Sequence, residues 1–400
     1  MVNLSSEEAK ALYGSQLAVS VSSLELYNKD PFSYFLQYGL KLRERPIFKI
    51  DERLTGSYFH RVLQEYYDLK KQSDDSFDEL FTQSLNTALK DPAYDIFSAN
   101  QFYNYQLKQL NFNLNRFIKQ FDIKMNKTKW HNHANEASFG MKADHSYSFT
   151  LSDQTRVHLR GIIDRIDTFN WQFKGQDYLV SQVTDYKSGA RAINLGDIFQ
   201  GTNIQLYTYL LVCLEKFQAQ YPDKRIIPFG AFYQKVSAPL KKVENQSEYA
   251  EMMAKNASGT VDLSQELKSN EYFLASQQLL EDIMKAGYDG EELYAYGLKK
   301  DGDFDKNRSR KILTLKEFQA LLDYIKEIIY NSSENIMSGD IQLRPLEDEK
   351  YLPSTTAYKS IAQFDLTEPG KHYRDRLKLS KETFFQMSAN ELNETSEEEE

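Results

Sequence analysis

Cysteine is nearly absent from this chain, because Cys213 is the single cysteine among 400 residues. One thiol excludes an internal disulfide framework, and it excludes any metal cluster held by several thiolates. Cys213 lies in the apolar, helix-like run YTYLLVCLEKF, so we expect it to be a buried core residue. The fold must therefore be held by packing and polar contacts, without disulfides.

Long hydrophobic runs are also missing. No apolar run approaches the roughly 20 residues that span a bilayer. The first residues, MVNLSSEEAKALYGSQ, lack the basic and apolar regions of a secretion signal. We therefore expect a cytoplasmic protein without a membrane segment. The motif G-x-x-x-x-G-K-[ST] is absent too, which predicts that the chain has no ATP site of its own.

Positive charge is in short supply, since the net charge is −9 at pH 7. This balance argues against a simple basic protein that coats DNA. Residues 391–400 carry six acids and no base, and we expect residues 386–400 to form an acidic disordered tail. Four stretches are basic, at 41–49, 119–129, 306–311 and 374–381. Each alone is typical of a solvated face, but as a set they could follow a phosphate backbone.

Aromatic residues are abundant, with 27 tyrosines and 25 phenylalanines. Helical spacing of apolar residues predicts helices in the first third of the chain, among them one over 52–71. Alternation of period two then predicts the strands of one antiparallel meander, at 136–141, 145–151, 156–169 and 177–187. A helix over 201–221 and a strand over 225–236 should follow.

The order of these elements predicts a single α/β (α+β) domain over residues 1–385, with helical extensions at both ends. Within it we expect four parts, namely a helical front (15–125), a catalytic core (126–236), a polar insertion (237–310) and a C-terminal helical return (311–385).

Charged residues interrupt two strand-like segments in LRGIIDRIDTFNWQFKGQDYLVSQVTDYKSG, residues 159–189. A two-residue turn at 174–175 pairs positions whose numbers sum to 349, so Asp164 should lie opposite Asp185. Asp185 and Lys187 are two apart and share a face of their strand. Opposed carboxylates repel each other, and Mg²⁺ or Mn²⁺ between them would relieve that repulsion.

A purely structural explanation exists for the same charges. Asp185 and Lys187 could form an ion pair at a strand end, and Asp164 could pair with Arg165 or Arg160. An isolated D-x-K pattern is more typical of such pairs than of a nuclease. The surrounding motifs are therefore needed to decide.

Together with its neighbours, this hairpin resembles the RecB-type branch of the PD-(D/E)XK nucleases. The matching segments are GSYFHRVLQEYYD (56–68) for a G-x-x-x-H helix, NEASFGM (135–141) for an E-x-x-F strand, GIIDRID, VTDYKSG, and QLYTYL (205–210) for a Q-x-x-x-Y helix. Five motifs in the family's order are far more specific than any one alone. The resemblance implies a restriction-endonuclease-like core, a central mixed sheet flanked by helices.

The resemblance also implies a role for each matching residue. Metal ligation would fall on His60, Asp164, Asp185 and the backbone carbonyl of Tyr186. Catalysis would fall on Asp164, Asp185 and Lys187, with Lys187 orienting the attacking water or stabilising charge on the phosphate. The residues that line the site or contact DNA would be Glu136, Arg165, Gln205 and Tyr209.

The two ends of the region narrow the resemblance further. SVSSLELYNKDPFSYFLQYGLKLRERP (20–46) and YLPSTTAYKSIAQFD (351–365) are similar to the ends of AddB/RexB-type nuclease domains. Typical AddB domains bind an iron–sulfur cluster through four cysteines. The matching positions here are Asp30, Pro353, Thr356 and Ala362. We therefore expect no iron–sulfur cluster, and packing between the two segments in its place.

The expected function is that of a Mg²⁺-dependent exonuclease on single-stranded DNA ends, with the 5′-ended strand as its substrate. It would act with an AddA/RexA-type helicase–nuclease subunit and the rest of the AddB-type subunit in double-strand-break repair. A complete subunit is much longer, so the chain would be a nuclease fragment or a truncated reading frame. Two alternatives stay open: a stand-alone phage or mobile-element nuclease, and a non-catalytic module that binds DNA or a helicase.

Overall fold

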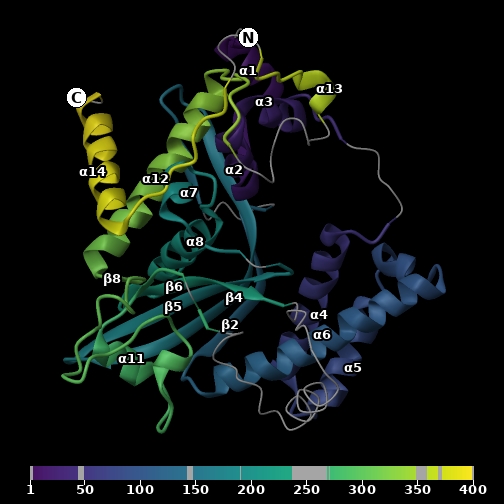
Figure 1. Cartoon of the computed structure of the whole chain (residues 1–400), viewed down its shortest axis with the longest axis vertical. Coiled ribbons are helices and arrows are strands. Elements are labelled where there is room, and N and C mark those ends of the chain that lie inside the picture. The colour runs from purple at the N-terminus through teal and green to yellow at the C-terminus, as the bar shows by residue number, and fades with distance from the viewer. Residues whose placement is uncertain are drawn as a thin grey trace.

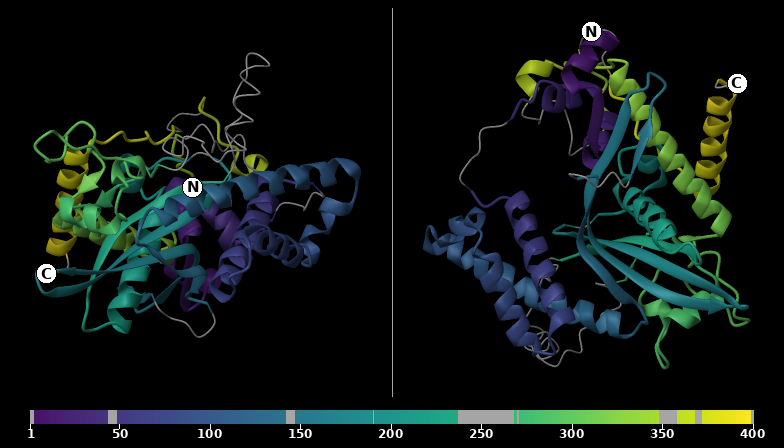
Figure 2. Two further views of the ribbon diagram at one scale, coloured as in Figure 1. Left: turned by 90° about the horizontal axis from the view of Figure 1, so that it is seen from below. Right: turned by 180° about the vertical axis from the view of Figure 1, so that it is seen from behind.

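The computed structural model describes residues 3–43, 49–141, 147–189, 191–236, 268–269, 271–347, 358–367 and 372–398. An eight-stranded mixed sheet lies at its centre, in the order β1-β4-β5-β6-β7-β8, with β2 and β3 both paired to β4. Helices lie on both sides of this sheet (Figures 1 and 2). The predicted fold class, a mixed central sheet flanked by helices, is therefore confirmed.

The elements follow one another in three stretches. The first contains α1 (Ser6–Tyr13), β1 (Gln16–Ser20), α2 (Val21–Lys29), α3 (Pro31–Tyr34), the π-helix Phe35–Gly39, α4 (Glu52–Gln72), α5 (Phe77–Ala88), the 3-10 helix Pro92–Ser98 and α6 (Gln101–Asn126). The second contains β2 (His131–Phe139), β3 (Ser148–Thr150), β4 (Arg156–Phe173), β5 (Gln176–Lys187), α7 (Leu195–Phe199), α8 (Gln205–Gln220) and β6 (Arg225–Lys235). The third contains β7 (Phe273–Leu274), α11 (Gln277–Ile283), the 3-10 helix Gly290–Glu292, β8 (Ile312–Leu313), α12 (Leu315–Met337), α13 (Lys359–Ala362) and α14 (Lys381–Glu398).

Strand β4 organises the sheet, because it is paired along its whole length. Its first residues pair with β1 in parallel and with β3 antiparallel, and the rest pairs antiparallel with β2 and β5. The predicted simple meander is wrong in this respect, since β2 and β3 each pair with β4. β5 pairs in parallel with β6, and α8 lies in the crossover that such a pair requires.

The β4–β5 hairpin has the predicted register. Its two turn residues, 174–175, have φ angles of 51° and 75°, as a type I′ turn requires. The pairs run from Phe173–Gln176 to Arg165–Thr184, so that paired positions sum to 349. A local turn signal thus sets which residues of the two strands face each other.

Helix α4 is amphipathic, and its buried face belongs to a second core beside the sheet. Asp51 caps the helix by accepting a hydrogen bond from the Leu54 N–H at 2.9 Å. The residues at helical spacing that pack with α5 and α6 are Tyr58, Phe59, Val62, Leu63, Tyr66 and Tyr67. These three helices lie together on one side of the sheet (Figure 1). The packing fixes the orientation of α4 and with it the partly buried His60.

The larger core lies between the sheet and helices α8 and α12. Cys213 on α8 is 2% exposed, so its prediction as a core residue is confirmed. Within the described part of the chain, no helix has both the length and the apolar character needed to cross a membrane.

Packing joins the N-terminal and C-terminal segments. Phe32 and Leu36 form a small buried cluster with Ala362. Pro353 and Thr356, two of the positions that match the cysteines of AddB domains, lie outside the described residues. The contact supports the expectation that side-chain packing holds the two ends together.

Helix α14 corrects the prediction of a disordered tail. It spans Lys381–Glu398, so the prediction for residues 386–400 is wrong as far as residue 398. Phe384 is fully buried, and its ring packs edge-on against that of Tyr324. The Tyr324 hydroxyl also donates to Glu391 at 2.6 Å. A few specific contacts therefore anchor a helix whose acidic composition suggested disorder.

Part of the predicted insertion also belongs to the sheet. Residues 237–267 and 270 lie outside the described residues. Beyond them β7 pairs with β6 through Phe273 and Gly230, and with β8 in parallel. Strand β7 is followed by the short helix α11, so this part of the predicted polar insertion has regular secondary structure.

Candidate active site

Three carboxylates form a row across β2, β4 and β5. The β4–β5 pair furthest from the turn joins Arg165 and Thr184, so the next position in this register places Asp164 opposite Asp185. On the other edge of β4, the residues on either side of Asp164 pair with those on either side of Glu136 in β2. Glu136 therefore lies opposite Asp164. Glu136 has a φ of 45°, a left-handed conformation that is uncommon for residues other than glycine and that clusters at functional sites. This set of acids, Glu136, Asp164 and Asp185, is called the acid row below.

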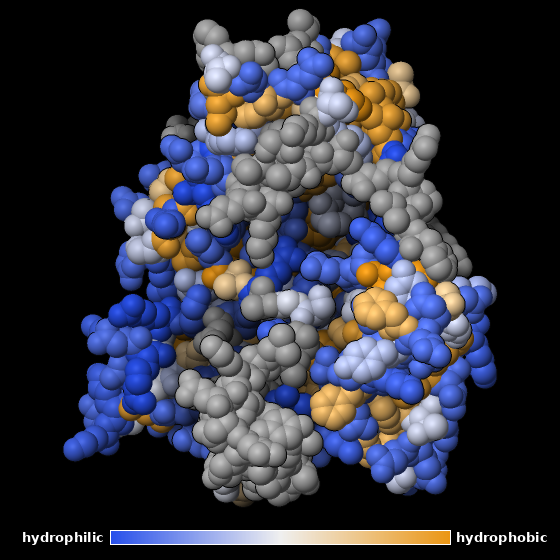
Figure 3. Space-filling model, turned by 45° about the vertical axis from the view of Figure 1, so that its right-hand side comes forward, coloured by the Kyte–Doolittle hydropathy of each residue, from blue (hydrophilic) through white to orange (hydrophobic). Residues whose placement is uncertain are grey.

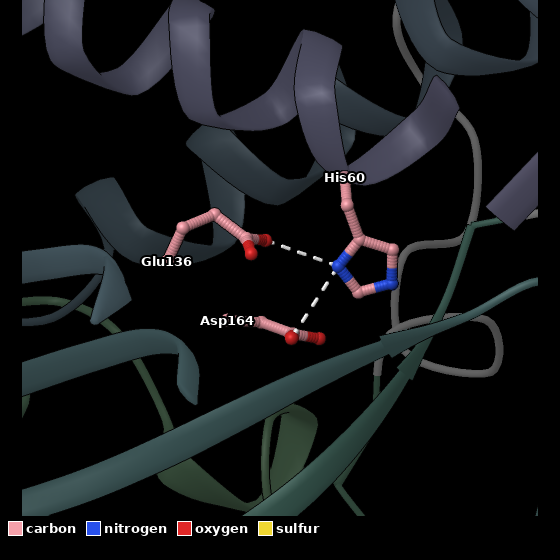
Figure 4. Close-up of side chains that lie close together, drawn as sticks. All are labelled: His60, Glu136 and Asp164. Atoms are coloured by element: carbon pink, nitrogen blue, oxygen red, sulfur yellow. Dashed lines mark hydrogen bonds and ion pairs between the residues drawn. The ribbon is translucent and has the colours of Figure 1, made fainter. Parts of the chain in front are cut away.

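Helix α4 brings His60 to the acid row. Its Nδ1 lies 3.1 Å from Oε1 of Glu136 and 3.3 Å from Oδ1 of Asp164, while the other ring nitrogen points away from both (Figure 4). The side chains of His60, Glu136 and Asp164 are 28%, 19% and 8% exposed. Solvent therefore reaches the site from the side of His60, and Asp185 lies deepest, with a side chain that is 3% exposed.

The acid row has surplus negative charge, as the pKa shifts show. Burial alone lowers the pKa of His60, but hydrogen bonds and charges of Asp164 and Glu136 outweigh burial and raise that pKa to about 10. Burial and then the charge of Asp164 raise the pKa of Asp185 to about 7, against the opposing effect of Lys187. Carboxylates in such surroundings are stabilised by a bound cation.

The backbone of Tyr186 also faces Asp164. Its N–H donates to Oδ2 of Asp164 at 2.7 Å. The carbonyl of the next residue, Lys187, faces β6 instead and accepts from the N–H of Val236 at 2.8 Å. Because the N–H and C=O of one strand residue point to the same side, and successive residues alternate, the carbonyl of Tyr186 is directed toward the acid row.

A chain of polar contacts holds Lys187 beside Asp185. Its Nζ lies 2.6 Å from Oδ2 of Asp185 and donates to Oε1 of Gln205 at 3.4 Å. The Gln205 amide in turn donates to the Tyr209 hydroxyl at 3.1 Å. Gln205 and Tyr209 lie one turn apart on α8. The predicted Q-x-x-x-Y pair thus positions the ammonium group at one end of the acid row.

Two residues without a predicted role support this arrangement. Oε1 of the buried Glu25, on α2, accepts the N–H groups of Ile204 and Gln205 at 2.9 and 3.0 Å, and so caps α8. Burial raises the pKa of Glu25, which Arg191 opposes from 3.7 Å. An acid inside the apolar helix pattern of residues 21–29 was a signal that could have revealed Glu25. The loop residue Arg191 offered no comparable signal.

Arg165 does not lie in the acid row, contrary to its prediction as a site-lining or DNA-binding residue. It is 3% exposed and pairs with Asp167, with its Nε 2.9 and 3.0 Å from the two carboxylate oxygens. Successive strand residues face opposite sides, so Arg165 points into the second core while Asp164 points to the row. Asp164 is therefore not neutralised by Arg165, one of the two partners that the structural explanation offered, whereas the Asp185–Lys187 ion pair of that explanation is present.

The residues present fit a divalent metal ion. Ligand atoms of His60, Glu136 and Asp164 lie within 4.8 Å of one another. Their nitrogen–oxygen distances of 3.1 and 3.3 Å are close to the roughly 3 Å between neighbouring ligands of an octahedral ion with bonds near 2.1 Å. The structure thus brings two of the predicted ligands, His60 and Asp164, together with Glu136. Asp185 lies opposite Asp164 in the strand register, and the N–H of Tyr186 is bonded to Asp164.

Comparison with known proteins agrees with this geometry. Residues 18–348 match the family described as the PD-(D/E)XK nuclease superfamily. The chain is 29% identical over 389 residues to the B subunit of an ATP-dependent helicase/deoxyribonuclease from Latilactobacillus sakei, covering 93% of this chain and 32% of that protein. It is 27% identical over 375 residues to a protein of the same description from Clostridium tetani, covering 91% and 31%. The chain spans about a third of the length of these relatives. With residues 18–348 matched, the chain belongs to the PD-(D/E)XK nuclease superfamily.

Proposed function

We propose that the chain is a deoxyribonuclease domain that hydrolyses phosphodiester bonds of single-stranded DNA with the help of Mg²⁺. The observation that carries this proposal is the acid row under His60, with Lys187 fixed at its end. The names of the relatives, which include deoxyribonuclease, support DNA as the substrate.

Mg²⁺, or Mn²⁺ in its place, would be held by His60, Asp164, Asp185 and the carbonyl of Tyr186, with Glu136 beside them. Oxygen-rich donor sets of this kind suit hard cations. When bound, such an ion supplies an activated water and neutralises charge on the phosphate. The remaining work is done by side chains of the chain itself.

Lys187 acts on the phosphate or on the attacking water. Its side chain is 25% exposed, so the ammonium group can donate a hydrogen bond outward while Asp185 holds it from behind. Gln205 and Tyr209 restrict its position before the substrate arrives. A donor fixed in advance stabilises developing charge without reorganisation at the moment of reaction.

The wider role is part of the same proposal. The chain would act with a helicase subunit and the remainder of an AddB-type subunit, and it would degrade the 5′-ended strand during double-strand-break repair. The relatives are named as one subunit of a helicase/deoxyribonuclease and are about three times as long. Co-purification with a helicase subunit would separate this role from that of a stand-alone nuclease.

The test is hydrolysis of end-labelled single-stranded DNA with Mg²⁺ by the wild type and by Asp185→Asn and Lys187→Met. We expect each substitution to lower the rate by roughly a hundredfold to a thousandfold, because each removes a group aimed at the reacting phosphate. Asp177→Asn is the matched control, since Asp177 is exposed at the far end of the same strand. Undiminished hydrolysis by Asp185→Asn would contradict the proposal.

A further inference from the structure

Two glycines, Gly56 and Gly189, are not explained by the fold. Every other glycine among the described residues either has a positive φ or lies where an added Cβ would come within 3.0 Å of another atom. At Gly56 and Gly189 the φ is not in the left-handed region, and an added Cβ would meet no atom of the described residues within 4 Å. Neither backbone conformation nor packing therefore requires glycine at these two positions.

Gly56 is also costly for the protein. It lies inside α4, where alanine would favour the helix and glycine weakens it. A residue that destabilises a helix and fills no tight space points to a requirement outside the folded chain. The requirement would be met if another molecule approached the helix backbone closely at this point.

Each glycine lies close in sequence to a residue at the site, although the two come from distant parts of the chain. Gly56 precedes His60 by four residues, so the two lie on the same face of α4. Gly189 follows Lys187 by two residues at the end of β5. The two open positions thus flank the residues that face the reacting phosphate.

A pocket of about 510 Å³ opens next to them, between the first turn of α4 and the second and third turns of α6. Its lining includes Thr55 and Ser188, the residues that directly precede the two glycines. Oε1 of Gln106 in its wall is buried and makes no hydrogen bond within the described residues. The volume is that of a small-molecule site. The space-filling view shows the molecule hollowed in the middle of one face, with largely hydrophilic walls (Figure 3).

The chemistry of the pocket favours a nucleoside over a phosphate. Asp51 and Glu52 outnumber Lys49, the one cation among the described lining residues, so the net negative charge of the rim disfavours a phosphate group. The amides of Gln106 and Gln109 can pair with the polar edge of a base, and Leu110 offers apolar contact. Buried amide groups left without partners are costly, so a ligand that supplies a donor to Gln106 is stabilised there.

We propose that the sugar–phosphate backbone of the substrate passes over Gly56 and Gly189, and that the nucleoside beside the scissile phosphate occupies this pocket. The inference rests on the proposed function for the identity of the substrate. It assigns the two glycines as positioning residues, whose lack of a side chain sets how closely the strand approaches His60 and Lys187.

The test measures binding of a fluorescent single-stranded oligonucleotide by anisotropy, in an Asp185→Asn background that does not cleave it. We expect Gly56→Leu to weaken binding about tenfold, because a side chain would fill the space of the strand. Gly56→Ala should weaken binding less, while its melting temperature rises by roughly 1 to 2 °C because alanine favours the helix. A position that matters only for folding would not show these two opposite effects.

A second variant examines the pocket. Gln106→Leu should weaken binding roughly threefold to tenfold, since it removes a hydrogen-bond partner of the base. Gln83→Leu is the matched control, because Gln83 is exposed on α5 away from the pocket. Binding of Mn²⁺ in the wild-type background, measured by calorimetry, should be unchanged in the Gly56 and Gln106 variants, which separates loss of DNA contact from loss of the metal site.

The outcomes distinguish this inference from the proposed function. Equal binding by the Asp185→Asn background and by its Gly56→Leu derivative, or no binding by either, would overturn the inference. If the wild-type chain never hydrolyses DNA but Gly56→Leu still weakens binding, the proposed function is contradicted, while the path of the strand over the two glycines still stands.

Discussion

The β4–β5 hairpin carries two groups of buried charges, one on each face. On one face lies the acid row with His60 and Lys187. On the other lies a group that we call the inner cluster, made of Arg165, Asp167, Gln182 on the strands and Lys124 on α6. Adjacent residues, Asp164 and Arg165, are divided between the two groups, so the same stretch of chain builds both.

The two groups differ in how their charges are balanced. In the inner cluster, Nη2 of Arg165 lies 2.8 Å from Asp167, Gln182 donates to the same carboxylate at 3.4 Å, and the guanidinium lies 4.5 Å over the ring of Tyr67. The acid row instead has three acids for one lysine and one histidine, both about a quarter exposed. Buried charges on a sheet can therefore be structural or functional. An excess of one sign of charge, together with access to solvent, indicates a functional site.

Replacing aspartate with asparagine, once in the acid row and once in the inner cluster, tests the difference between the two groups most strongly. We expect Asp164→Asn to lower Mg²⁺-dependent hydrolysis by at least roughly a thousandfold, about 4 kcal/mol in the activation free energy. The fold should be kept, because an asparagine oxygen can still accept the hydrogen bond from Tyr186 N–H. Rates on labelled single-stranded DNA and the melting temperature, measured on one preparation, check both parts.

The same substitution at Asp167, three residues further along β4, should reduce stability and not only the rate of hydrolysis. Asp167→Asn leaves Arg165 buried with no counter-charge of equal strength, and breaking a buried pair costs about 3 to 5 kcal/mol of the free energy of unfolding. Urea unfolding followed by circular dichroism measures this loss. If Asp167→Asn were as stable as the wild type, the inner cluster would not be the structural element that the comparison assigns.

Local signals in the sequence predicted much of the site. The two-residue turn fixed the register of the β4–β5 hairpin, in which the numbers of paired residues sum to 349. Period-two alternation placed Asp185 and Lys187 on one face of their strand. Helical spacing of aromatic residues located α4, and with it His60. These features depend on residues within one or two turns or strands of each other, so their pattern is visible without the fold.

What the sequence did not reveal depends on contacts across long separations. The resemblance assigned Glu136 to the site, but its position opposite Asp164 depends on the register in which β2 pairs with β4. Glu25 caps a helix that begins about 180 residues later. Arg165 is a different case, since strand alternation already placed it on the face opposite Asp164. Its incorrect assignment to the site came from the motif resemblance, which outweighed that physical signal.

Metal binding should stabilise the folded protein through the acid row and His60, and it should not depend on the inner cluster. The wild type should gain about 2.7 kcal/mol in the free energy of unfolding at a Mn²⁺ concentration one hundred times the dissociation constant. His60→Ala should reduce that gain by removing a ligand, whereas Lys124→Met should leave it unchanged. Denaturant unfolding at several Mn²⁺ concentrations gives the values, and an equal gain in His60→Ala would argue against ligation by His60.

The smallest effect concerns the pH dependence of Lys124, the one lysine of the inner cluster. Burial lowers its pKa from 10.5 to about 8, against the opposing charges of Glu271 and Asp167. Below pH 8 the lysine is protonated in both states, so the folded state bears the full cost of a buried charge. Between pH 8 and 10.5 the unfolded chain binds more protons than the folded protein, and the free energy of unfolding must rise with pH.

Relative to Lys124→Met, the wild type should gain on the order of 1 to 3 kcal/mol in the free energy of unfolding across that pH window. Comparing the two proteins cancels the titration of His60, whose raised pKa acts in the opposite direction over part of the same range. A constant difference between them from pH 8 to 10.5 would mean that Lys124 is not held in the fully buried surroundings that distinguish the inner cluster from the acid row.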